Sequence, residues 1–258
     1  MIHVPGGGSA AGLRLLLADL HVHTVVSPCA EVEMIPPLII RRARELGLGV
    51  IAVTDHNTAD NVAAVQRAAM GSGITVLPGM EVQSREEVHV LCLFGSLAAL
   101  LAWQDVVLAH LPHGRNDADI LGAQFVVDET GEFVRMNERL LLTSTQMAIH
   151  EIVQGVRNLG GLAIAAHVDR PTFSLLVNLG FVPPKIDLAA LEISNRMTPA
   201  AFHASHPELA HWPLILSGDA HRLSEMRANT LLRVKHPSLD ELRLALGGIE
   251  GRIVKVLT

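Results

Sequence analysis

Nine side chains of the types that bind transition metals lie at the ends of short apolar runs in this chain. Imidazole, carboxylate and thiolate groups hold zinc, manganese or iron in proteins. Nine ligands are too many for one ion and enough for two or three. The pattern predicts a multinuclear metal site, with metal-assisted hydrolysis as its chemistry. The nine residues are His21, His23, Cys29, His56, Glu81, His89, His167, Asp219 and His221.

Two pairs of these residues have the spacing i, i+2. His21 and His23 stand in LADLHVHT, and Asp219 and His221 stand in LSGDAH. Alternate residues of an extended chain share one face, so each pair directs both ligands to the same side. Both pairs follow apolar runs that read as buried strands, which favours metal ligands over surface residues.

Glu81 and His89 are expected to face each other across a hairpin. Only seven residues separate them, whereas a parallel crossover needs about a dozen or more. The segment EVHVLCLF must therefore return antiparallel to the strand that ends near Glu81. A lone carboxylate there would be costly unless it is paired or bound to metal. His89 alone would be interpreted as a core histidine, but opposite Glu81 we interpret it as a ligand.

Two residues near these ligands have two interpretations each. Cys29 is either a thiolate ligand or a small buried apolar group. Asp55, which precedes His56 in VTDHN, either orients an imidazole or caps a helix. If the substrate is a phosphate ester, Asp55 or His221 is the candidate for protonating the leaving oxygen, and the sequence does not choose between them.

Three further residues are candidates for contacts with the substrate. Arg170 follows His167 in AAHVDRP, and a guanidinium fixed beside metal ions suits a phosphate group. Its alternative is a salt bridge to Asp169 or another acid. Asn195 and Arg196 follow an apolar run and are weaker candidates of the same kind.

Strands and helices that alternate along the chain must position these residues. The order β-α-β-α-β up to residue 82 predicts parallel strands with right-handed crossovers. Residues 96–145 carry no candidate ligand and predict a helix followed by a hairpin that turns at residues 128–131. Strands are expected at residues 13–19, 48–54, 74–82, 162–166, 189–194 and 213–217, helices at 36–47, 58–70 and 146–158, and a strand–helix–strand unit at the end.

Composition limits the possible partners and compartments. The net charge is −6 and no basic stripe is present, so double-stranded nucleic acid is not expected. Six Phe, two Trp and no Tyr leave few rings for stacking on a nucleobase. Two cysteines, no signal peptide and no membrane-length apolar run predict a cytoplasmic protein. Gly6, Gly7 and Gly8 predict a loop, and the oligomeric state is left open.

The motifs DLHVHT, VTDHN, PGMEV, VHVLCLF, AAHVDRP and SGDAH, together with Cys29 eight residues after His21, resemble the PHP family, named after polymerase and histidinol phosphatase. The resemblance covers about residues 15 to 222. It implies an α/β fold of the distorted TIM-like (β/α)7 barrel type, as one domain over residues 1–258 with a helix-plus-hairpin insertion at about 96–145. It also implies two or three divalent metal ions (Zn, Mn or Fe) at the C-terminal rim.

The resemblance also implies a division of the ligands. His21, His23, Glu81 and Asp219 are similar to the ligands of one ion. A bridging Glu81, with His89 and His167, is similar to the second set, and Cys29, His56 and His221 to the third. Many phosphatases of the family have histidine or aspartate near the Cys29 position, so the third ion is less defined here.

The implied activity is hydrolysis of a small phosphate monoester by metal-activated water, with a small phosphorylated metabolite as the partner. A non-catalytic, metal-binding regulatory module is one alternative. An amidohydrolase-type enzyme is the other, although such enzymes generally lack the early Asp-His pair and the Asp-x-His ending.

Overall fold

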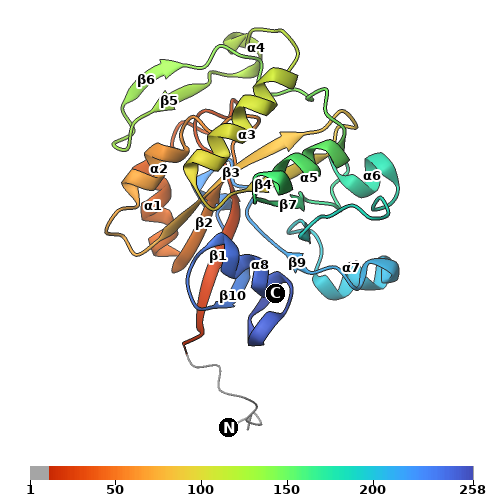
Figure 1. The fold of residues 1–258 in the computed structure, drawn as a ribbon. Coiled ribbons are helices and arrows are strands. Elements are labelled where there is room, and N and C mark those ends of the chain that lie inside the picture. The colour runs from red at the N-terminus through yellow and green to blue at the C-terminus, as the bar shows by residue number, and fades with distance from the viewer. Residues whose placement is uncertain (1–11, 258) are drawn as a thin grey trace.

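A bent sheet of nine strands forms the centre of the computed structural model, which describes residues 12–257. Helices cover its outer side (Figure 1). The loop predicted at residues 6–8 lies outside the described residues. In spatial order the strands are β11 (Ile253–Val256), β10 (Thr230–Val234), β1 (Arg14–Val22), β2 (Leu48–Val53), β3 (Thr75–Gln83), β4 (His89–Leu93), β7 (Leu162–Ala165), β8 (Ala190–Glu192) and β9 (Leu214–Ile215).

Seven of these strands, β1 to β4 and β7 to β9, form the wall of a distorted barrel. The wall closes where the end of β1 meets the chain after β9, through a parallel bridge between Val22 and Ala220. The main-chain N–H of His23 donates to Ala220 O at 3.0 Å, and the N–H of Ala220 donates to His21 O at 3.1 Å. The predicted barrel fold is therefore confirmed, and its closure brings the two i, i+2 pairs to the same rim.

The strand directions agree with the predicted order. β1, β2 and β3 are parallel neighbours, and β3 pairs with β4 in antiparallel register, with Gln83 opposite His89. This is the hairpin expected from the short spacing. β7 then runs antiparallel to β4, and β8 and β9 run parallel to β7. The last strands, β10 and β11, extend the sheet beyond β1 in antiparallel pairing.

Helix α1 (Pro36–Glu45) shows why these residues form this element. Prolines occupy its first turn, where their missing N–H costs no helical hydrogen bond, and Arg42 and Arg44 lie in its last turn, near the negative end of the helix dipole. Ile39 and Ile40 are buried on one face. The remaining helices of the barrel are α2 (Val62–Ala68), α3 (Leu97–His110), α5 (Ile149–Asn158), α6 (Leu175–Leu179), α7 (Pro199–Ser205) and α8 (Leu239–Leu246).

Two apolar clusters fill the two sides of the barrel wall. Val50 and Ala52 of β2 belong to a cluster made mainly of strand residues, whereas Ile51 and Val53 belong to one shared with α1 and α2. This alternation follows from the two-residue period of a strand. Leu239 and Leu242 of α8 join the first cluster, so α8 packs beneath the barrel. The strand ends that carry the candidate ligands lie at the opposite end.

The segment at residues 96–145 has two parts with different roles. Helix α3 buries Leu100, Trp103 and Val107, so it covers the barrel as the other helices do. The rest holds the short helix α4 (Ala118–Leu121) and a separate two-stranded sheet of β5 (Phe125–Val127) and β6 (Phe133–Met136). This sheet lies at the upper left of Figure 1, beside α3. The turn between its two strands contains residues 128–131, where the hairpin was predicted to turn.

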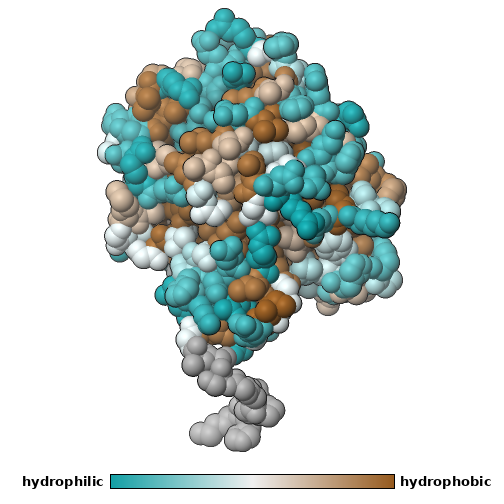
Figure 2. All heavy atoms as spheres, viewed as in Figure 1, coloured by the Kyte–Doolittle hydropathy of each residue, from teal (hydrophilic) through white to brown (hydrophobic). Residues whose placement is uncertain are grey.

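On the face shown in Figure 2, apolar residues interrupt the hydrophilic surface over α3. Leu101 and Val106 of this helix are 42% and 38% exposed. Within the described part of the chain, no helix is long and apolar enough to cross a membrane.

A buried ion pair joins α8 to the residue that precedes β11, and its removal should lower the free energy of unfolding. Arg252 donates two hydrogen bonds to the Glu241 carboxylate, at 2.8 and 2.9 Å. These bonds lower the pKa of Glu241 to about 2. Glu241→Gln should reduce the free energy of unfolding at pH 7 by about 2 kcal/mol, as measured by urea denaturation.

This contribution should also depend on pH. Because the folded pKa of Glu241 lies below its unfolded value, the stabilisation is complete above about pH 4.5 and is lost as the pH falls towards 2. The stability difference between wild type and Glu241→Gln should therefore narrow below about pH 4.5. A difference that stays constant down to pH 3 would contradict this assignment.

Candidate metal centre

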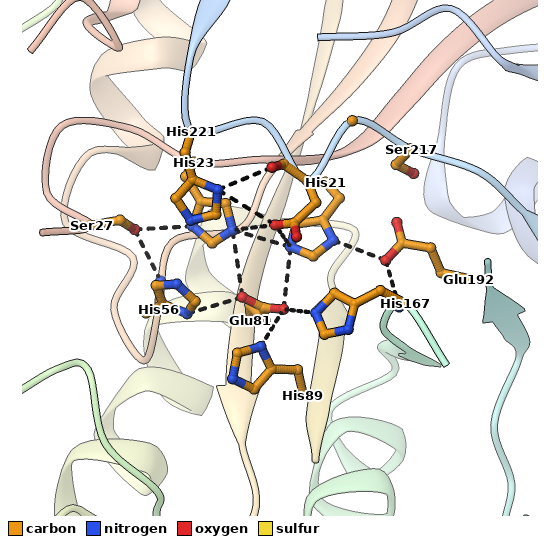
Figure 3. Close-up of polar contacts among 12 residues, drawn as sticks. His21, His23, Ser27, His56, Glu81, His89, His167, Glu192, Ser217 and His221 are labelled. Carbon is orange, nitrogen blue, oxygen red and sulfur yellow. Dashed lines mark hydrogen bonds and ion pairs between the residues drawn. The ribbon is translucent and has the colours of Figure 1, made fainter. Parts of the chain in front are cut away.

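All nine predicted ligands come from strand ends or adjoining loops at one rim of the barrel. Most of them form a cluster of imidazoles around one carboxylate (Figure 3). His21, His23, His56, Glu81, His89 and His167 are buried, and Asp219 and His221 are partly exposed. Burial of so many ionisable groups is costly unless they neutralise one another or bind cations.

Glu81 lies at the centre of this cluster. Its Oε1 lies 2.8 Å from His89 Nδ1, 3.2 Å from His167 Nε2 and 3.3 Å from His21 Nε2. Its Oε2 lies 2.9 Å from His56 Nδ1 and 3.5 Å from His23 Nε2. Oε1 therefore faces ligands of both predicted sets, and Oε2 faces two further imidazoles, so the carboxylate could be shared by two ions.

Three groups of ligand atoms are close enough to hold an ion, with all atoms of a group within 4.8 Å of one another. The three groups are His23, His56 and His221; His21, His23, Glu81 and Asp219; and His56, Glu81 and His89. In the second of these groups, Asp219 Oδ1 lies 3.2 Å from His21 Nε2 and 3.4 Å from His23 Nε2.

Cys29 and His167 lie outside these groups, although both are close to them. His167 faces Glu81 Oε1, and its Nδ1 is buried without a hydrogen-bond partner among the described residues. Cys29 is exposed, so the alternative interpretation as a small buried apolar group is wrong. Desolvation of its thiol would raise the pKa of Cys29, but the neighbouring imidazoles of His221 and His56 outweigh this effect and lower the pKa to about 6. A thiol of this kind is largely thiolate at neutral pH, which is the form that binds metal.

The donor set fits divalent cations. His21 Nε2 and His23 Nε2 face each other at 3.1 Å, so at most one proton can lie between them, and both also face Asp219. Glu81 Oε2 is buried and makes no hydrogen bond of acceptable geometry with any described residue. Imidazole nitrogens and carboxylate oxygens that converge in this way match the ligands of zinc, manganese or iron.

The pKa values within the cluster are shifted in opposite directions. Burial would lower the pKa of His21, but the carboxylates of Glu192, Asp219 and Glu81 hold it well above its usual range. Burial and the nearby imidazoles of His221 and His56 lower the pKa of His23. Burial would raise the pKa of Glu81, but His89, His21 and His56 lower it well below its usual range. Glu81 therefore stays ionised, as a metal ligand must.

Two of the predicted ligands adopt strained backbone conformations. His167 has φ 28° and Asp219 has φ 45°, in the left-handed region that non-glycine residues rarely adopt. Each follows a strand closely, so the unusual turn redirects its side chain over the rim. Strain of this kind persists where surrounding contacts hold it, and it is concentrated at functional sites.

Glu192 is a site residue that the sequence analysis missed. Its Oε2 lies 2.9 Å from His21 Nδ1 and accepts a 3.0 Å hydrogen bond from the main-chain N–H of His167. It thus holds the ring of His21 with Nε2 directed at Glu81 and Asp219, as carboxylates commonly orient metal-binding histidines. The strand sequence AALEIS shows this glutamate, but only the fold brings it beside His21.

Ser27 and Asp55 orient the second histidine of the HxH pair. His23 Nδ1 lies 3.0 Å from Ser27 Oγ, which donates to Asp55 Oδ1 at 2.7 Å. Asp55 also accepts hydrogen bonds from the N–H and hydroxyl of Thr24. Its carboxylate is fully buried and lines neither cavity beside the metal cluster. This position favours the orienting role over transfer of a proton to a substrate.

Two cavities flank the cluster. One has a volume of about 370 Å³ and includes Asn195 and Arg196 in its lining; the other has about 600 Å³ and includes Phe173. Both are lined by the same four residues at their junction, Cys29, Arg170, Asp219 and His221.

The arginine candidates differ in their partners. Arg170 forms an ion pair with Asp219, as in the alternative of a salt bridge to an acid other than Asp169. Asp169 accepts hydrogen bonds from Ser194 instead. Arg170 remains 34% exposed and can reach a ligand in either cavity. Arg196 is exposed and has no acidic partner among the described residues.

A barrel whose rim gathers imidazoles and carboxylates is typical of metal-dependent hydrolases. A model of the PHP domain matches residues 19–176. The chain belongs to the PHP domain family, as its motifs indicated.

Similar proteins include nucleases and a phosphoesterase. The chain is 30% identical over 82 residues to the 5'-3' exoribonuclease Rnm of Salmonella typhimurium, a match that spans 31% of this chain and 27% of that protein. The lesion-specific endonuclease PfuEndoQ of Pyrococcus furiosus shares the fold, with a TM-score of 0.70, 18% identity and coverage of 93% of this chain and 58% of the endonuclease. A putative metal-dependent phosphoesterase of Bifidobacterium adolescentis has a TM-score of 0.55, 18% identity and coverage of 80% and 87%.

These findings contradict the expectation that the partner is a small phosphorylated metabolite and that double-stranded nucleic acid is excluded. Endonuclease Q, with 17% identity, a TM-score of 0.66 and coverage of 93% of this chain and 58% of its own, holds a 27-mer duplex with an abasic lesion at its active site. The same fold therefore accepts a duplex, so the exclusion drawn from the net charge of this chain is wrong. Charge summed over the whole chain does not describe the local field of a rim that binds cations.

Removal of Glu192 should weaken metal binding without direct loss of a ligand. Glu192→Ala should lower the affinity of the ion held by His21 by about 10- to 100-fold, and Glu192→Gln, which keeps an acceptor oxygen, should lower it less. Titration with a competing chelator, followed by elemental analysis, measures this. Glu208→Ala is the control, because that side chain is 65% exposed. Equal metal affinity in all three variants would show that Glu192 does not orient His21.

Proposed function

We propose that this protein hydrolyses phosphate esters of nucleotides or nucleic-acid strands with two or three divalent ions. The observation that carries the proposal is the position of Glu81, whose two oxygens face two different groups of imidazoles. When bound there, the cations lower the pKa of water and polarise the phosphoryl oxygens. The names of the similar nucleases support nucleic acid as the source of the ester.

The ligands of the ions remain the predicted ones. His21, His23, Glu81 and Asp219 would hold one ion, and Glu81, His89 and His167 a second. The close contact of His56 with Glu81 Oε2 makes His56 a candidate ligand of either the second ion or a third ion shared with His221 and Cys29. Counting the bound ions distinguishes these arrangements.

The chain's own residues then position the ester. Arg170 stands at the junction of the two cavities, where its guanidinium can neutralise charge on phosphoryl oxygens. Asn195 and Arg196 line the smaller cavity. Their amide and guanidinium groups can contact a second polar group of the substrate. Since the two cavities share this junction and otherwise have different linings, an ester with a substituent in each cavity would fit better than a small monoester.

His221 is better placed than Asp55 to give a proton to the leaving oxygen. It lines both cavities, whereas Asp55 lines neither. In a two-ion site His221 would be free to carry the proton. In a three-ion site it would be a ligand instead, because a protonated imidazole cannot bind metal at the same time.

Loss of Glu81 should remove metal and activity together. Glu81→Ala deletes the oxygens that face both groups of imidazoles, so metal content and hydrolysis should both fall, the latter by more than about 100-fold. Elemental analysis and a hydrolysis assay on 5'-phosphorylated oligonucleotides measure the two effects. Glu33→Ala, at an exposed carboxylate, should change neither. Full activity with a full metal load in Glu81→Ala would refute the mechanism.

The same assay tests the role of Arg170. Arg170→Ala should lower kcat/KM by about 100-fold, the usual effect of losing one group that stabilises transition-state charge, while most of the metal is retained. Arg170→Lys should recover part of this loss, and Arg44→Ala, at an exposed residue of α1, should have no effect. Unchanged kcat/KM in Arg170→Ala would limit Arg170 to its ion pair with Asp219.

A comparison of substrates distinguishes the proposed phosphoesterase from an amidohydrolase and from a non-catalytic regulatory module. Metal-replete protein should hydrolyse 5'-phosphorylated oligonucleotides at least about tenfold more efficiently than p-nitrophenyl phosphate. Preferential hydrolysis of dihydroorotate would indicate amidohydrolase chemistry instead. Metal-replete protein that hydrolyses none of these would indicate a regulatory module.

A further inference from the structure

Phe173 has an aromatic ring at the edge of the larger cavity. Of the Phe and Trp side chains in the chain, it alone lines either cavity beside the metal cluster. Its ring stacks on that of His89, with centroids 4.9 Å apart and an interplanar angle of 10°. Phe173 nevertheless remains 38% exposed, so part of the ring surface is open to a ligand.

Backbone contacts hold the Phe173 ring in place, although the backbone of Phe173 itself has an unfavourable conformation. Phe173 has φ 57°, which is unusual for a bulky residue. Its carbonyl accepts a 3.1 Å hydrogen bond from the main-chain N–H of His89. The next residue, Ser174, caps α6 and donates a 2.6 Å hydrogen bond to Arg170 O. The loop that carries Arg170 thus also fixes Phe173.

Candidate metal ligands line one side of the cavity, and the remaining side offers both apolar and polar contacts. Leu142, which is 36% exposed, lines it together with Thr143 and Ser144. Gln83 Nε2 donates a 2.9 Å hydrogen bond to Ser144 Oγ. Its volume of about 600 Å³ lies within the range of ordinary ligand pockets. A flat ring with polar edges matches this combination of an aromatic platform and hydroxyl groups.

We propose that the part of this cavity lined by Phe173, Leu142, Thr143 and Ser144 is a nucleobase subsite, in which the base of the nucleotide next to the reacting phosphate stacks on Phe173. The proposal rests on the proposed function and adds to it the part of the substrate that the larger cavity binds. Stacking requires only a π-face, so the subsite should accept all four bases with modest differences. Arg170, at the junction of the cavities, then contacts the phosphate of the same nucleotide.

Binding to metal-loaded protein tests the subsite without the need for turnover. Calorimetry compares adenosine 5'-monophosphate with ribose 5-phosphate, which has the same phosphate and sugar but no base. Wild type should bind the nucleotide about tenfold more tightly. Phe173→Leu should abolish this preference, with the Kd of ribose 5-phosphate and the metal content unchanged within about twofold. Phe173→Trp should keep the preference or increase it, because indole offers a larger platform.

Phe181→Leu is the matched control, because Phe181 is 58% exposed and lies outside both cavities. Equal Kd values for the two ligands in wild type would overturn the proposal. So would a Phe173→Leu variant that weakens both ligands equally and loses metal, because Phe173 would then act only by packing His89. Failure of the proposed function would be a separate result, namely the absence of ester hydrolysis by metal-replete wild type.

Discussion

The arrangement of the rim depends on one buried carboxylate surrounded by imidazoles. Glu81 is 1% exposed, and the ring nitrogens of five histidines lie within 3.5 Å of its oxygens. An ionised carboxylate in such a place is stable only if positive charge compensates it. Without bound metal the imidazoles must supply that charge, and with metal the cations would. The site is therefore organised by electrostatics before any substrate enters.

The irregular features of the barrel serve this arrangement. The antiparallel return of β4 after β3 places His89 beside Glu81, which a regular parallel crossover would not do. Left-handed backbone conformations at His167 and Asp219 direct both side chains over the rim. Glu192 and the pair of Ser27 and Asp55 then fix the outer ring nitrogens of His21 and His23. These departures from regular structure lie next to candidate ligands, as expected where function opposes stability.

The barrel was predicted from the family resemblance, whereas local patterns in the sequence were sufficient for the β3–β4 hairpin and for the residues that gather at the rim. The i, i+2 pairs and the short spacing from Glu81 to His89 involve residues close together in the sequence, so they can be interpreted before the three-dimensional structure is known. Glu192 could not be found in this way, because 171 residues separate it from His21. His56 belongs to two of the three groups of possible ligands. This could not be predicted either, because it depends on distances in the folded protein and not on spacing along the sequence.

The prediction that failed came from composition rather than from position. A small number of aromatic residues argued against nucleotides, yet one of them, Phe173, lies beside the metal cluster. A negative net charge argued against nucleic acid, although the charge that a substrate meets is that of the rim and its ions. Totals over a chain describe its average surface, whereas binding depends on the few groups that line a cavity.

The central claim is that two metal ions would share the Glu81 carboxylate. Anomalous diffraction from crystals of the metal-loaded protein tests it most directly. The account predicts two anomalous peaks about 3.5–4 Å apart, both in contact with the Glu81 carboxylate, with His21, His23 and Asp219 on one ion and His89 and His167 on the other. A single ion, or ions that make no contact with the Glu81 carboxylate, would contradict it.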